Sequence, residues 1–138
     1  MPGNFSVEVR NRREDLAPAI EAAEAWLEKE RVPPSIAYFA NLAIEEVVTN
    51  CIQYGYDDDR EHAIRITMSL ADRLMTMQIV DDGEAFDPLA APPPDLTAKV
   101  ADRREGGLGI YLLRKLADDM TYERYNGTNR TTLAKKFA

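Results

Sequence analysis

The sequence predicts an α+β fold, a two-layer sandwich with helices on one face of a mixed, mostly antiparallel sheet. Two hydrophobic periods alternate along the chain: a period of two, typical of half-buried strands, and a spacing of three or four, typical of amphipathic helices. Their order is strand, helix, helix, strand, strand, long loop, helix, strand, strand, which favours segregated layers over a parallel sheet. The chain has 138 residues, a length that fits one domain over 1–138.

The first strand and the first helix lie within the first 30 residues. Phe5, Val7 and Val9 alternate with polar neighbours, as in a strand with one buried face. The Ala- and Glu-rich stretch 13–30 has apolar residues at helical spacing. Pro18 lies inside this stretch, so we expect the helix to begin near it.

The second helix is longer and is expected over 36–53, after a break at the two consecutive prolines of 32–35. Gly55 is the expected C-terminal cap. Apolar residues step along this helix by three or four positions and predict one buried stripe. The stripe consists of Ile36, Phe39, Ala40, Ala43, Val47 and Cys51.

The second half of the chain contains two hairpins and one helix. Residues 64–70 alternate strictly and predict a strand that turns directly into a second strand over 74–80. A helix is expected over 110–118. An Asn-Gly turn then joins strands at 120–125 and 130–137 into a closing hairpin.

Composition excludes several classes of protein. The chain carries 17 Lys and Arg against 24 Asp and Glu, a net charge of −7, which argues against a nucleic-acid partner because phosphate binding depends on Lys and Arg. No apolar run approaches the ~20 residues of a membrane span, and the N-terminus lacks the features of a signal peptide, so we expect a cytoplasmic protein. The single cysteine, Cys51, excludes an internal disulfide and is interpreted as a small core residue. The single histidine, His62, is interpreted as a solvated surface residue.

Two constellations of polar residues could carry chemistry. Glu46 and Asn50 are four residues apart on the second helix and therefore share one face beside the apolar stripe. They form either a solvated edge or the wall of a pocket. Asp81, Asp82 and Gly83 end a strand, where carboxylates can accept hydrogen bonds from a ligand and glycine permits a close approach. The alternative is an ordinary Asp-Gly turn.

Two further segments lie near the third helix and in the last hairpin. Three of the seven glycines lie in 106–109, directly before a helix, where backbone N–H groups can face an anion; a flexible hinge is the alternative. Segment 127–132 is either part of a site or a hairpin turn with β-prone threonines. The loop 84–105 holds four of the eight prolines, and loops of this length are commonly functional or mobile.

In this order the four elements resemble the nucleotide site of the GHKL ATPase superfamily, whose domain has the Bergerat fold. The stretch IEEVVTNCIQYGY at 44–56 is similar to the N box, and VDDGEAFDP at 80–88 to the first glycine box. GGLGIYLLRKLADDMTYER at 106–124 is similar to the second glycine box, and NGTNRTTLAKKF at 126–137 to the end of the fold. The similarity covers nearly the whole chain, and the short length resembles that of anti-sigma-factor serine kinases.

The resemblance implies a role for each matching residue. Asn50 would bind Mg²⁺, and Glu46 would orient or deprotonate the attacking hydroxyl. Asp81 would accept the adenine amino group, with Gly83 beside it in the first glycine box. The second glycine of that box is replaced by Ala85, whose Cβ disfavours a positive φ at the hinge of the following lid.

The remaining implied contacts involve the phosphates and the far side of adenine. Residues 84–105 correspond to a lid over the triphosphate, and either Arg103 or Arg104 is a candidate phosphate contact within it. Either Thr131 or Thr132 corresponds to the threonine near adenine. The second glycine box is expected to pass close to the phosphates at Gly107, Leu108 and Gly109.

The function implied by the resemblance is that of an ATP- and Mg²⁺-dependent serine protein kinase. Such a kinase phosphorylates a STAS-domain anti-anti-sigma partner, and it sequesters a sigma factor or another response regulator. A homodimer is plausible by the same resemblance. The alternative is an ATP-gated protein-binding module without phosphotransfer activity; the intact Glu46 favours the kinase.

Overall fold

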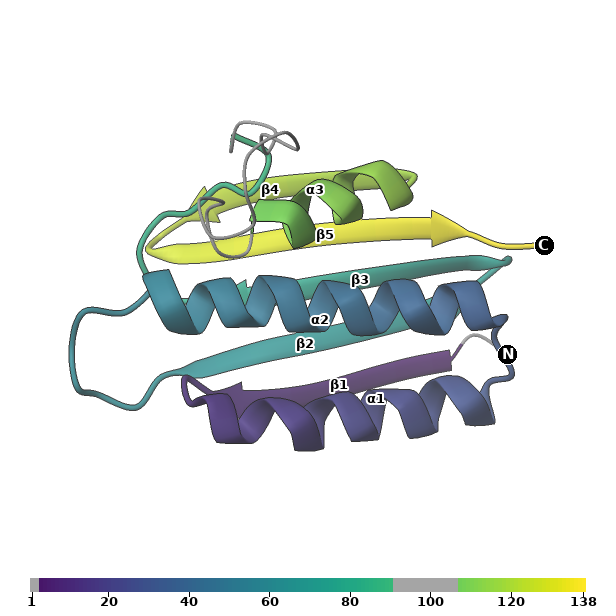
Figure 1. Cartoon of the computed structure of the whole chain (residues 1–138), viewed down its shortest axis with the longest axis horizontal. Coiled ribbons are helices and arrows are strands. Elements are labelled where there is room, and N and C mark those ends of the chain that lie inside the picture. Colours follow the sequence, from purple (N-terminus) through teal and green to yellow (C-terminus); the bar gives the residue numbers. More distant parts are fainter. Residues whose placement is uncertain (1–2, 91–106) are drawn as a thin grey trace.

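The computed structural model describes residues 3–90 and 107–138, which form a five-stranded sheet with three α-helices side by side over one face (Figure 1). The order of the strands is β1-β2-β3-β5-β4. All four pairings are antiparallel, so the α+β sandwich is confirmed, while the expected mixture of strand directions is not seen among the described strands. The elements are β1 (Gly3–Arg10), the 3-10 turn η1 (Arg13–Asp15), α1 (Leu16–Lys29), α2 (Pro34–Tyr54), β2 (Ala63–Ala71), β3 (Leu74–Asp81), α3 (Gly107–Leu116), β4 (Asp119–Tyr125) and β5 (Thr128–Lys136).

Prolines mark the start of both long helices. Helix α1 begins at Leu16, two residues before Pro18. The proline therefore lies in the first turn, where its missing N–H has no helical partner to lose. Helix α2 begins with Pro34 in its first turn, and the carbonyl of Pro33 accepts the N–H of Ile36 at 3.0 Å.

The expected cap at Gly55 is confirmed. Its N–H donates to the carbonyl of Cys51 at 2.9 Å and closes the last turn of α2. The backbone of Gly55 stays in the right-handed region, so left-handed geometry does not explain the glycine. Its reason is packing, because a Cβ at this position would lie 2.5 Å from the carbonyl oxygen of Cys51.

The core lies between the sheet and the helices. Alternation along β2 and β3 turns one side chain in two toward α1 and α2, and these side chains are buried. The predicted stripe of α2 is buried from Ile36 to Val47, whereas Cys51 is only partly buried. Buried residues of β2 and β3 in this core include Ile64, Ile66, Met68, Met75, Met77 and Ile79.

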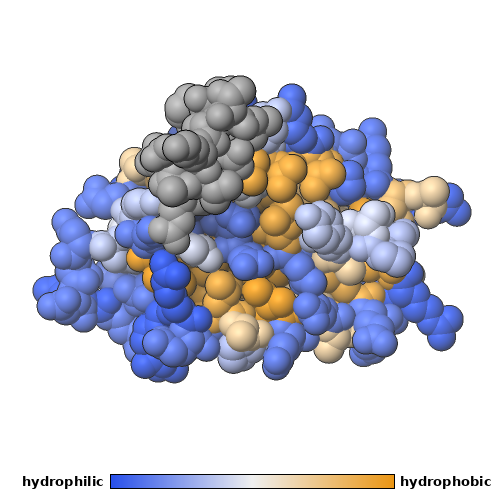
Figure 2. All heavy atoms as spheres, in the orientation of Figure 1, coloured by the Kyte–Doolittle hydropathy of each residue, from blue (hydrophilic) through white to orange (hydrophobic). Residues whose placement is uncertain are grey.

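Helix α3 begins at Gly107, three residues before the predicted start. The second and third glycines of the 106–109 segment therefore belong to the first helical turn and do not precede it. On the helical face of the molecule, apolar side chains gather over α2 and α3 within a largely hydrophilic surround (Figure 2), and Leu108 and Leu112 of α3 are exposed. Within 3–90 and 107–138, no helix is both long and apolar enough to cross a bilayer.

Candidate functional site

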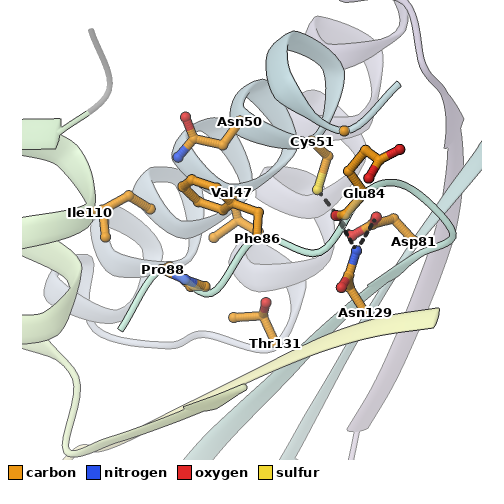
Figure 3. Close-up of a pocket in the computed structure, with 11 residues that line it drawn as sticks. Val47, Asn50, Cys51, Asp81, Glu84, Phe86, Pro88, Ile110, Asn129 and Thr131 are labelled. Carbon is orange, nitrogen blue, oxygen red and sulfur yellow. Dashed lines mark hydrogen bonds between the residues drawn. The ribbon is translucent and has the colours of Figure 1, made fainter. Parts of the chain in front are cut away.

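A pocket lies where the second half of α2, the end of β3 with its following loop, α3 and β5 meet (Figure 3). Three residues predicted from the sequence line it together: Asn50, Asp81 and Thr131. They come from three different elements and are as much as 81 positions apart in the chain (131 − 50). The other lining residues are Val47, Cys51, Gly55, Glu84, Phe86, Pro88, Ile110 and Asn129.

Asp81 is the polar centre of the pocket and is 7% exposed at the end of β3. Its Oδ1 accepts the N–H of Gly83 at 2.9 Å and Nδ2 of Asn129 at 3.0 Å. Its Oδ2 accepts the thiol of Cys51 at 3.2 Å. Because each carboxylate oxygen can accept about two hydrogen bonds, Oδ2 has the capacity for one further donor from a ligand.

Apolar side chains form the walls beside Asp81. Val47 of α2, Ile110 of α3, and Phe86 and Pro88 of the loop surround the space in front of the carboxylate (Figure 3). The ring of Phe86 is stacked against Tyr54, with 6.2 Å between the centroids and 16° between the planes. Apolar walls with a few placed polar groups are typical of a small-molecule site.

Asn50 lies at the end of the pocket away from Asp81 (Figure 3) and is 5% exposed. One helical turn earlier on α2, the carboxylate of Glu46 lies against Gly109 in the first turn of α3. A Cβ at Gly109 would be only 1.9 Å from Cδ of Glu46. The carboxylate can occupy this place only because residue 109 is a glycine.

The environment of Glu46 alters its acidity. Burial of the carboxylate raises its pKa, and the negative charge of Glu45 raises it further. The start of α3 beside it carries the positive end of a helix dipole, which favours a nearby anion. A carboxylate with a raised pKa beside a pocket is a candidate general base.

Gly83 was expected to permit the close approach of a ligand. In the structure it is the end of α2 that approaches Gly83 closely. A Cβ at Gly83 would lie 2.6 Å from the carbonyl oxygen of Gly55, and that oxygen accepts the N–H of Glu84 at 2.6 Å. The two glycines therefore join the end of β3 to the end of α2, backbone against backbone. Gly83 is not among the described residues that line the pocket, so its contact with a ligand stays a prediction.

Comparison with known proteins assigns the family. A model of the histidine kinase-like ATPase domain matches residues 9–135. The chain belongs to this family. The resemblance to GHKL ATPases, which rested on four motifs in order, is thereby confirmed.

The relatives of this family member are named as kinases and anti-sigma factors. The serine/threonine-protein kinase BtrW of Bordetella bronchiseptica is 28% identical over 117 residues, which are 82% of each chain. The serine-protein kinase RsbW of Bacillus subtilis is 28% identical over 92 residues, 62% of this chain and 56% of that protein. An anti-sigma F factor of Clostridium botulinum is 28% identical over 97 residues, 69% of this chain and 67% of that protein. The chain thus spans little more than half the length of the RsbW relative.

A solved structure supports the fold. The RsbU and RsbW domains of a Mycobacterium tuberculosis protein superpose with a TM-score of 0.70. The match has 17% sequence identity and covers 97% of this chain and 32% of the other. At this identity the match shows a shared α+β architecture.

The structure bears on one alternative that the sequence left open, although contact of either threonine with a nucleotide stays a prediction. Thr131 lines the pocket, while Thr132 faces the other side of the sheet because side chains alternate along β5. Four other predicted residues do not line the described pocket. Glu46 lies in α2, and the first turn of α3 contains Gly107, Leu108 and Gly109. Arg103, Arg104 and most of the predicted lid at 84–105 fall outside the described residues.

Sequence reasoning missed two residues that contact Asp81. Asn129 is 2% exposed and its amide contacts Asp81 directly. The signal was its place in segment 127–132, one residue before the predicted strand and two residues before Thr131. Cys51 was interpreted as a core residue, yet its thiol lines the pocket.

The interpretation of His62 as a solvated surface residue is also incomplete. Its ring lies between two carboxylates: Nε2 is 2.8 Å from Asp58 and Nδ1 is 3.2 Å from Asp82. The ring also stacks on Tyr56 with 4.4 Å between centroids. These contacts connect the acidic turn after α2 with the residue next to Asp81.

Proposed function

We propose that this chain is an ATP- and Mg²⁺-dependent serine protein kinase of the partner-switching type. It would phosphorylate a STAS-domain anti-anti-sigma protein and sequester a sigma factor or a similar response regulator. The observation that carries the proposal is the intact Glu46–Asn50 pair, one turn apart on α2 beside the Asp81 pocket. The kinase and anti-sigma names of the relatives support it. A homodimer remains a prediction from the resemblance, and a cytoplasmic location remains a prediction from the sequence.

Asp81 favours adenine as the base. Its Oδ2 can accept a hydrogen bond from the exocyclic amino group of adenine, whereas a 6-oxo purine would present an acceptor to an acceptor. Val47, Phe86 and Ile110 supply apolar surface for the ring. With the base at Asp81, the triphosphate would extend toward Asn50 and the start of α3.

Asn50 fits a Mg²⁺ ion that is shared with the phosphates. Its carboxamide oxygen is a hard ligand of the kind that Mg²⁺ prefers, and Mg²⁺ in phosphate sites commonly takes few protein ligands. The described part of the chain has no group of three or more His, Cys, Asp or Glu that could hold a metal by itself. When bound, the ion would neutralise charge on the phosphates.

Glu46 would act as the general base. It is one turn before Asn50, a rise of about 6 Å along the helix, so its carboxylate would be near the predicted metal position. The carboxylate of Glu46 would accept the proton of the serine hydroxyl. The serine oxygen would attack the γ-phosphorus as ADP leaves. The start of α3 would present backbone N–H groups to the phosphate oxygens.

The test follows radiolabel from γ-labelled ATP onto a purified STAS-domain partner in the presence of Mg²⁺. Wild type should transfer label, and Glu46→Gln should transfer it roughly 10²–10⁴-fold more slowly while still binding ATP. Glu45→Gln is the matched control, because Glu45 is exposed on the neighbouring position. ATP binding by wild type without any transfer would refute the kinase and leave an ATP-gated binding module.

A further inference from the structure

The amide of Asn129 uses all of its hydrogen-bonding capacity at the end of the pocket where Asp81 lies. In the pairing of β3 with β5, Asn129 lies directly opposite Asp81. Its Nδ2 is within hydrogen-bond distance of Asp81 Oδ1 at 3.0 Å, the carbonyl of Glu84 at 2.9 Å and the carbonyl of Gly83 at 3.2 Å. One side chain therefore contacts both the carboxylate of Asp81 and the backbone that follows it.

These contacts make the two oxygens of Asp81 inequivalent. Oδ1 is occupied by Asn129 and by the N–H of Gly83, so the oxygen with spare capacity is Oδ2. The carboxylate torsion of an aspartate has a broad energy minimum. Without the Asn129 donor, the remaining contacts would leave more freedom to turn Oδ2 away from a ligand.

The orientation of Asn129 is itself set by two residues of the edge strand β4. The hydroxyl of Tyr122 and Nη1 of Arg124 both donate to Oδ1 of Asn129, the latter at 2.8 Å. A flipped amide would place its NH₂ group against these two donors. Arg124 also donates to the carbonyl of Gly83 at 3.0 Å, so β4 holds both the amide and the start of the loop.

We propose that Asn129 is a positioning residue that turns Oδ2 of Asp81 toward the purine, and that Tyr122 and Arg124 set its orientation from β4. The inference rests on the proposed binding of ATP. Its consequence is that discrimination between 6-amino and 6-oxo purines depends on three side chains besides Asp81, two of which lie outside the described lining of the pocket.

The test compares dissociation constants for ATP and inosine triphosphate, measured by calorimetry on the full chain. Wild type should prefer ATP. Asn129→Ala should reduce that preference at least about tenfold, the order expected for loss of a hydrogen bond to a charged group, and should weaken ATP while changing inosine triphosphate less than about threefold. A merely structural role would weaken both nucleotides equally, and that result would overturn the inference.

Milder variants keep the test decisive if Asn129→Ala does not fold. Tyr122→Phe and Arg124→Met each remove one donor to Asn129 and should reduce the preference about threefold. Arg130→Met is the matched control, because Arg130 is an exposed neighbour that pairs with Glu123; it should leave the preference unchanged. A preference that survives both β4 variants overturns only this inference. A wild type without preference would overturn the proposed adenine site as well.

Discussion

Gly109→Ala should separate phosphotransfer from folding. The added Cβ would lie 1.9 Å from Cδ of Glu46 and 2.1 Å and 2.4 Å from its two oxygens. Non-bonded carbons approach to about 3.5–4.0 Å, so the Glu46 carboxylate must move by roughly 1.5–2 Å. The clash is with the far end of a flexible side chain, so the backbone can stay in place.

The expected effects on stability and activity therefore differ. Alanine in the first turn of a helix lowers the entropy of the unfolded chain and adds about 0.4–1 kcal/mol of stability where the backbone is compatible. The free energy of unfolding should thus stay within about 1 kcal/mol of wild type. A displacement of the Glu46 carboxylate by this distance should slow label transfer by about 10²-fold.

The assay measures label transfer to the STAS-domain partner at saturating ATP, together with urea unfolding. Leu112→Ala is the control, because Leu112 is an exposed residue one turn further along α3 and should leave transfer unchanged. Transfer at the wild-type rate in a folded Gly109→Ala protein would show that the position of Glu46 does not matter. Loss of folding would show that the contact is structural and refute the proposed reason for the glycine.

Three further predictions concern pH and reactivity. Transfer should fall as pH is lowered through a Glu46 pKa above 4.5, and Glu45→Gln should shift that fall to lower pH in a pH–rate profile. The pKa of His62 is raised above 6.5, chiefly by its hydrogen bond to Asp58. The contribution of His62 to the free energy of unfolding is therefore full below pH 6.5 and is lost as pH rises through the pKa of the folded state. The free energies of wild type and His62→Gln, measured by urea unfolding, should become equal above that pKa. Burial raises the pKa of Cys51, so iodoacetamide should alkylate it slowly until urea unfolds the chain, as followed by mass spectrometry.

The sequence alone determined the types and order of the elements and two of the polar residues that line the pocket, Asn50 and Asp81. Periods of two and of three to four depend on neighbouring residues, so each strand and helix could be recognised locally. The Glu46–Asn50 pair was equally local, because four residues on a helix always share a face. Asp81 was found because it ends an alternating strand.

Only the tertiary structure decided which distant residues meet. Hydrophobic period does not encode strand order, and it was the insertion of β5 between β3 and β4 that placed Asn129 opposite Asp81. The same pairing turned Thr131 rather than Thr132 toward the pocket. The need for glycine at residue 109 likewise arises from α2, 63 positions earlier at Glu46 (109 − 46). Such contacts depend on how layers pack, which no local pattern in the chain specifies.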